Sequence, residues 1–135
     1  MADPKCVSAK CDIKDIFDKD LKPAVLKQMR QTLERELNKK KDVLEFKDSC
    51  KEGFLLNVTL DSLTVDDEDK PTSLEAKVTI VGVAIGGTAT GFKATGNRKV
   101  SGINSKKIEE EAKFIVDAAL GNVITKQVIP QMLKP

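Results

Sequence analysis

The stretch from Gly53 to Val65 alternates apolar and polar side chains, and this alternation constrains the fold more than any other feature of the chain. A period of two is typical of a β-strand with one buried face. The phase of the alternation reverses near Asp61 or Ser62, which indicates a β-bulge there. A second alternating stretch runs from Leu74 to Ile80, after an acidic turn at residues 66–71. Together they predict an antiparallel hairpin.

Amphipathic helices flank this β-rich centre. From Asp20 to Asn38, apolar side chains recur three and four residues apart, and Pro23 lies in the first turn, where its missing N–H costs little. A second helical pattern starts at Asn104 or Ser105 and continues to Pro130, which we expect to stop or kink the helix.

Short stretches at residues 43–46 and 88–96 predict up to two further strands. The sequence therefore predicts a two-layer α+β sandwich. Its antiparallel sheet of three to four strands carries the N-terminal helix and the long C-terminal helix on one face. A chain of 135 residues has the size of one domain. We expect a loose N-terminal segment over residues 1–19, with at most a short helix at 12–18, and a single α+β domain over residues 20–135.

The three cysteines, Cys6, Cys11 and Cys50, bear on the compartment. A disulfide within the N-terminal segment, or from it to Cys50, would fix an otherwise frayed terminus. The alternative is three unpaired thiols in a reducing compartment. We favour a disulfide and a periplasmic or secreted protein, with Met1 added to a mature terminus from which a signal peptide has been removed.

The chain has no His, Trp or Tyr. It therefore lacks the commonest general base and the commonest transition-metal ligand, and we expect no enzymatic activity, no metal site and no cofactor. Lys and Arg number 23 against 21 Asp and Glu, a balance that argues against a nucleic-acid partner. No apolar run approaches the roughly 20 residues that span a bilayer, so no transmembrane segment is expected.

Two groups of residues are candidates for a binding site. The first is a flexible basic loop before the last helix, which could hold an anion or a partner and contains Arg98, Lys99, Lys106 and Lys107. Its alternative is an ordinary solvated connection. The second is an excess of apolar side chains that could form a partner or ligand surface: Val81, Val83, Ile85, Phe114, Ile124, Val128 and Met132. Its alternative is that these side chains complete the core.

The run Lys51-Glu-Gly-Phe-Leu-Leu-Asn-Val-Thr-Leu-Asp-Ser-Leu is followed by an acidic turn, by Leu74-Glu-Ala-Lys-Val-Thr-Ile, by a strand of small residues and by a long amphipathic helix. This pattern, over roughly residues 20 to 130, resembles small periplasmic α+β domains of the TolB N-terminal, curli-secretion lipoprotein and penicillin-binding-protein-activator type. The resemblance implies an envelope-associated protein that binds other proteins.

These observations lead to one functional hypothesis and one alternative. We expect a non-enzymatic protein-binding or assembly accessory module of the bacterial cell envelope, with another envelope protein as its partner. The alternative is a small carrier that holds an apolar ligand or lipid between helices and sheet.

Overall fold

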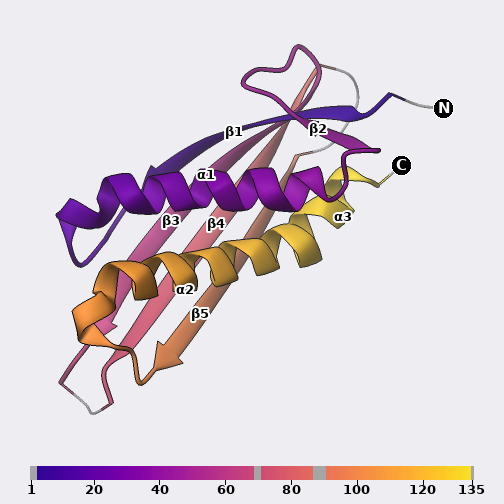
Figure 1. The fold of residues 1–135 in the computed structure, drawn as a ribbon. Helices are drawn as coiled ribbons and strands as arrows, with labels where there is room; N and C mark the ends of the chain where they lie inside the picture. The colour runs from indigo at the N-terminus through magenta and orange to yellow at the C-terminus, as the bar shows by residue number, and fades with distance from the viewer. Residues whose placement is uncertain (1–2, 69–70, 87–90, 135) are drawn as a thin grey trace.

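The computed structural model describes residues 3–68, 71–86 and 91–134. Figure 1 shows two helices lying side by side on one face of a single sheet. The sheet has five strands in the order β2-β1-β3-β4-β5. Their bounds are β1 Lys5–Ile13, β2 Leu44–Phe46, β3 Gly53–Asp66, β4 Ser73–Ile85 and β5 Phe92–Ser101. The helices are α1 (Lys22–Asn38) and α2 (Ile108–Val123). The prediction of a two-layer α+β arrangement is confirmed.

The expected number and direction of the strands are wrong. Instead of three to four antiparallel strands, the sheet is mixed, because β1 runs parallel to both of its neighbours, β2 and β3. The expectation of a loose segment over residues 1–19 is therefore also wrong within the described part of that segment. β1 is an inner strand whose side chains at Val7 and Ile13 are buried against the helices.

The short helix expected at residues 12–18 is absent from that described stretch. Ile13 instead ends β1, and Ile16 forms an isolated parallel bridge with Leu63 of β3. The apolar spacing that suggested a helix has another cause. Both isoleucines continue the buried face of the sheet and belong to the core.

The central hairpin of β3 and β4 agrees with the alternation in the sequence. Its strands pair antiparallel from Gly53 to Asp66, and the register shifts between Leu60 and Ser62. The predicted bulge is thereby confirmed. It keeps Leu63 on the buried face after the phase reversal, because one extra residue restores the alternation. The strand expected from residue 88 begins at Phe92, and residues 88–90 of that prediction lie outside the described part of the chain.

Both helices begin with a short 3-10 turn whose first amides are capped by a side chain. The Asp18 carboxylate accepts from the Asp20 amide at 2.9 Å, so Asp18 caps the turn Lys19–Leu21 before α1. The Asn104 side chain accepts from the Lys106 amide at 3.0 Å and caps the turn Ser105–Lys107 before α2, as the sequence predicts.

Pro130 does not end the last helix. A π turn, Ile124–Val128, follows α2 and leads into the short helix α3, Ile129–Met132. A proline ring would collide with the carbonyl four residues earlier in a regular α-helix, and the wider π turn avoids that collision. The chain thus continues helically past Pro130 and keeps Val128 and Met132 buried.

Candidate functional site

One face of the sheet carries the helices, and the other is not covered by a helix (Figure 1). We call the second face the open face. Strand register and the alternation of side chains place on it Ser8, Lys10 and Asp12 of β1; Leu55, Asn57, Thr59 and Asp61 of β3; Glu75, Lys77, Thr79, Val81, Val83 and Ile85 of β4; and Lys93, Thr95, Asn97 and Lys99 of β5. A hydrogen bond from Thr79 Oγ1 to Asp61 Oδ2 crosses this face.

Apolar side chains gather at one end of the open face. Leu55 lies directly opposite Val83 in the β3–β4 register. Val81 is 37% exposed and Val83 is 43% exposed, although both stand on an inner strand of the sheet. Ile85 is half-buried at the end of the same strand. We call these four residues the apolar strip. Lys93 lies directly opposite Val81 on β5, so the strip has a cation beside it.

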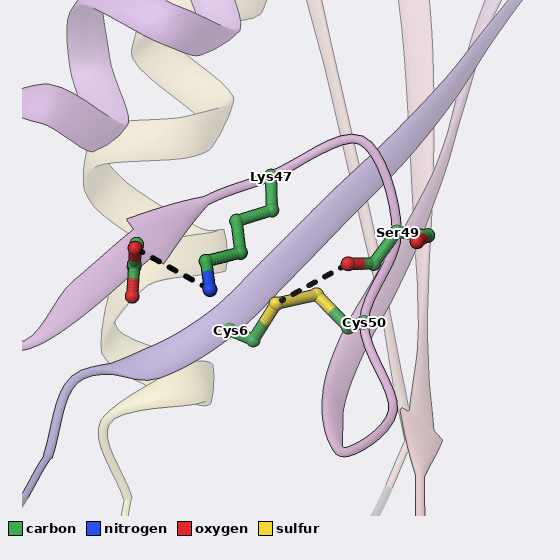
Figure 2. The surroundings of a disulfide bond; sticks show 5 residues. Cys6, Lys47, Ser49 and Cys50 are labelled. Carbon is green, nitrogen blue, oxygen red and sulfur yellow. Dashed lines mark hydrogen bonds and ion pairs between the residues drawn. A yellow bond between two sulfur atoms is a disulfide. The ribbon is translucent and has the colours of Figure 1, made fainter.

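Figure 2 shows a disulfide at the start of β1. It joins Cys6 of β1 to Cys50 in the loop between β2 and β3, with a sequence separation of 44. Of the open disulfide alternatives, the structure selects the bond from the N-terminal segment to Cys50. Gly53, at the end of this loop, has φ +124°, and a Cβ there would collide with the Cys6 carbonyl oxygen.

Cys11 carries the remaining thiol. It is half-buried on the helix side of β1, where burial raises the pKa of the thiol, with the Arg30 guanidinium acting in the opposite direction.

The predicted apolar surface is divided between two faces and the core. Ile124, Val128 and Met132 are fully buried, so for them the alternative that they complete the core is correct. Phe114 is 63% exposed, but it stands on α2, on the helix side of the sheet. Only the strand residues Val81, Val83 and Ile85 lie together.

The predicted basic loop is partly a strand. Arg98 and Lys99 belong to β5, and as neighbours in a strand they point to opposite faces of the sheet. Lys106 and Lys107 lie in the 3-10 turn before α2. Placing Arg98 and Lys99 in a loop was therefore wrong, because pairing with β4 continues to Ser101.

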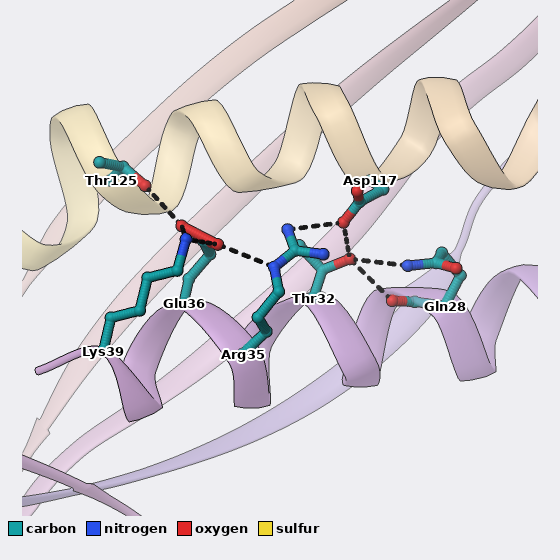
Figure 3. Close-up of polar contacts among 7 residues, drawn as sticks. All are labelled: Gln28, Thr32, Arg35, Glu36, Lys39, Asp117 and Thr125. Atoms are coloured by element: carbon teal, nitrogen blue, oxygen red, sulfur yellow. Dashed lines mark hydrogen bonds and ion pairs between the residues drawn. The ribbon is translucent and has the colours of Figure 1, made fainter. Parts of the chain in front are cut away.

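A polar seam, shown in Figure 3, connects α1 to α2 and to the π turn. The Arg35 guanidinium contacts Asp117 at 2.8 Å and Glu36 at 3.0 Å, and these two hydrogen bonds raise the pKa of Arg35. Glu36 also accepts from Lys39 at 3.0 Å and from the Thr125 hydroxyl at 3.1 Å. Burial raises the pKa of Glu36, but the hydrogen bonds from Lys39, Arg35 and Thr125 outweigh burial and leave this pKa below its ordinary value.

The side chains of the seam supply one another's hydrogen-bond partners. Thr32 is fully buried and donates to Asp117 at 2.7 Å, while Gln28 donates to the Thr32 hydroxyl at 3.2 Å. Because each charged group of this seam already has partners, the arrangement fits helix-to-helix adhesion better than chemistry on a substrate.

A surface groove beside α1 was not foreseen from the sequence. A cavity of about 620 Å³ lies between α1 and the β2 segment, lined among others by Arg30, Phe46 and Asp48. The guanidinium of Arg30 lies 5.0 Å from the centre of the Phe46 ring and 3.1 Å from Asp48 Oδ1. Arg30 meets Phe46 and Asp48 only because the β2 segment packs beside α1, so no local sequence pattern could reveal this groove.

None of the helices in the described part of the chain is long and apolar enough to cross a membrane.

Solved structures with a similar fold come from bacteria. The PelC dodecamer from Paraburkholderia phytofirmans superposes with a TM-score of 0.61 and 11% identity, over 93% of this chain and 89% of that one. The rare lipoprotein B from Shewanella oneidensis has a TM-score of 0.54 and 16% identity, over 93% of this chain and 96% of that one. At such low identity the likeness establishes the fold alone. The chain matches no protein-family model and no curated protein.

Proposed function

We propose that this chain is a non-enzymatic protein-binding accessory domain of the bacterial cell envelope, and that it binds its partner through the open face. The apolar strip carries this proposal. Two valines that are more than a third exposed on an inner strand, next to Leu55, form an apolar surface that gains free energy when a partner covers it.

The charge beside the strip indicates the chemistry of the partner. Lys93 is exposed and stands opposite Val81. A complementary surface would present an apolar centre flanked by carboxylates. We therefore propose that the partner of the open face is another envelope protein, whose contact surface is apolar at its centre and flanked by carboxylates.

The compartment rests on two supports. A disulfide such as Cys6–Cys50 persists where the environment is oxidising. The similarity in fold to the rare lipoprotein B from Shewanella oneidensis, a bacterial lipoprotein, also supports an envelope location. PelC was solved as a dodecamer, so proteins with this fold can be parts of larger assemblies.

Absence of catalysis is part of the proposal. The chain contains no His, and every buried polar side-chain atom of the described residues has a hydrogen-bond partner. A carrier would need apolar side chains that line a ligand cavity between helices and sheet. Ile124, Val128 and Met132, which were candidates for that lining, are instead packed in the core.

The test compares two charge substitutions on opposite faces. Val83→Asp alters the apolar strip, and Phe114→Asp alters the exposed phenylalanine on the helix side as a matched control. After chemical cross-linking of intact cells, we expect one envelope protein to co-purify with the wild type and with Phe114→Asp, and to fall at least about tenfold with Val83→Asp. Equal recovery from all three proteins, or loss with Phe114→Asp alone, would contradict the proposal.

A further inference from the structure

The outer edge of β1 is open over half of its length. β2 pairs with β1 only at Lys5, Cys6 and Val7 in the part of the chain that the structure describes. The last contact is from the Lys47 amide to the Val7 carbonyl, at 2.9 Å. Figure 1 shows β1 continuing well beyond the end of β2. From Ser8 to Ile13, the backbone edge of β1 is therefore not covered by β2.

The direction of the backbone groups follows from the bonds already made. Lys5 N–H and the Val7 carbonyl both point toward the β2 segment. Backbone groups alternate sides along a strand, so the N–H and C=O groups of Ala9 and Cys11 point to the same open side. The amide of Ile13, next in this series, donates to the Asp12 carboxylate at 2.8 Å. This side-chain contact closes the far end of the open edge, as edge strands commonly require.

Space lies above this edge on the helix side. A cavity of about 450 Å³ is lined by Cys11 of β1 and by Leu26, Lys27, Arg30, Gln31 and Glu34 of α1. Cys11 and Leu26 are half-buried apolar groups at its floor. Arg30, on the rim of this cavity, forms exposed ion pairs with Glu34 at 3.5 Å and with Asp48 at 3.1 Å.

We propose that the open edge of β1 pairs with the same edge of a second copy of this chain. An antiparallel pair about a two-fold axis at Cys11 places Lys10 opposite Asp12 of the second copy, and Asp12 opposite its Lys10. The same register places Ala9 opposite Ile13, where pairing exchanges the bond from the Ile13 amide to Asp12 for a bond to the Ala9 carbonyl of the second copy. Both charged residues are exposed and stand on the open face, where opposite charges in directly facing positions attract. An interface made of one patch used twice is the usual form of a two-fold dimer.

Neighbouring registers are less favourable. An axis at Lys10 brings the two Lys10 side chains face to face, and an axis at Asp12 does the same to two carboxylates, which destabilises both pairings. An axis at Ala9 would require the Val7 edge, which the Lys47 amide already occupies. The Cys11-centred register thus combines the free outward backbone groups of Ala9 and Cys11 with matched charges.

This interface goes beyond the proposed function, because it lies at the sheet edge and leaves the apolar strip free. Contact through one short edge buries less surface than a standard interface, so we expect a dissociation constant on the order of micromolar to millimolar.

The first experiment measures mass against concentration by analytical ultracentrifugation. We expect a concentration-dependent dimer for the wild type. Lys10→Asp should weaken it roughly tenfold, because each Lys10–Asp12 attraction becomes a repulsion, and the double variant Lys10→Asp/Asp12→Lys should restore it. Lys99→Asp is the matched control, with the same charge change on the opposite edge strand, and should leave the dimer unchanged.

A short bis-maleimide provides the geometric readout. It should link the two Cys11 thiols of the dimer, since Cys6 and Cys50 are joined in a disulfide, and Cys11→Ser should abolish the link without changing the mass distribution. Ala9→Pro removes an outward N–H that β3 does not use and should also dissolve the dimer. A chain that remains monomeric up to about 1 mM, or a dimer insensitive to Lys10→Asp and Ala9→Pro, overturns the inference. Neither result bears on binding by the apolar strip.

Discussion

Glu36 shows how hydrogen bonds can offset the cost of burying a charged residue at a helix interface. Its side chain is 9% exposed and receives bonds from Arg35, Lys39 and Thr125, which come from two helical segments. Its folded pKa lies below the ordinary value of 4.5. The ionised form therefore stabilises the fold above the unfolded pKa, and this contribution is lost as the pH falls through the folded pKa.

Glu36→Gln is expected to lower the free energy of unfolding at pH 7 by about 1 kcal/mol, since hydrogen bonds to a charged acceptor become neutral ones. Urea denaturation across the acid range measures the effect, and the gap to the wild type should close at low pH. Glu34→Gln, an exposed carboxylate on the same helix, is the control and should change stability by less than about 0.5 kcal/mol. A gap that persists unchanged in acid would show that the charge of Glu36 is not the cause.

Gly53 is a second residue on which the fold depends. It begins β3 with φ +124°, and any Cβ would meet the backbone carbonyl of Cys6. We expect Gly53→Ala to cost about 3 kcal/mol or more, through backbone strain and a collision with a group that cannot move away. Gly102→Ala is the control: its φ is +77°, but nothing lies within 4 Å of the new Cβ, so only about 1 kcal/mol of strain is expected. Equal losses of stability in urea would disprove the collision.

At the scale of elements, the parts that the sequence predicted are those whose signal is local. The β3–β4 hairpin, its bulge and the two long helices follow from the spacing of side chains such as Phe54, Leu56 and Val58, which repeats within one segment. β1 escaped prediction although it also alternates. Its inward positions include Ala9 and Cys11, which are too small to give a strong apolar signal, and its parallel partners lie dozens of residues away.

The candidate site divides in the same way. Val81 and Val83 could be selected because both faces of their strand are apolar, and the structure leaves them exposed on one face. The sequence alone does not distinguish these exposed valines from Ile124, Val128 and Met132, since all five are apolar side chains in excess of the expected core. Their burial depends on a π turn that carries the helix past Pro130, and periodicity alone does not predict this turn. Leu55 was missed because its exposure depends on which face the helices cover.

At the scale of the whole molecule, the Cys6–Cys50 bond closes the chain over α1 and β2 and ties the first strand to the start of the third. A closed loop with a separation of 44 residues lowers the entropy of the unfolded chain, which corresponds to about 4 kcal/mol.

We therefore expect Cys6→Ser/Cys50→Ser to lose about 4 kcal/mol in urea denaturation, and the wild type to lose a similar amount under a reductant. Cys11→Ser should change little. Under non-reducing conditions, titration with a thiol reagent after denaturation should find one free thiol per chain. Three free thiols in protein isolated from its native compartment would remove the argument for an oxidising environment.

The central claim is that the open face holds a partner in the cell. The most direct measurement introduces a photo-cross-linking amino acid in place of Val83 on the open face or, in a control variant, in place of the exposed Glu110 of α2. The adducts that the two variants form in living cells are then compared. The account predicts one dominant adduct with another envelope protein from position 83, absent from position 110. The same adducts from both positions, or none from position 83, would contradict it.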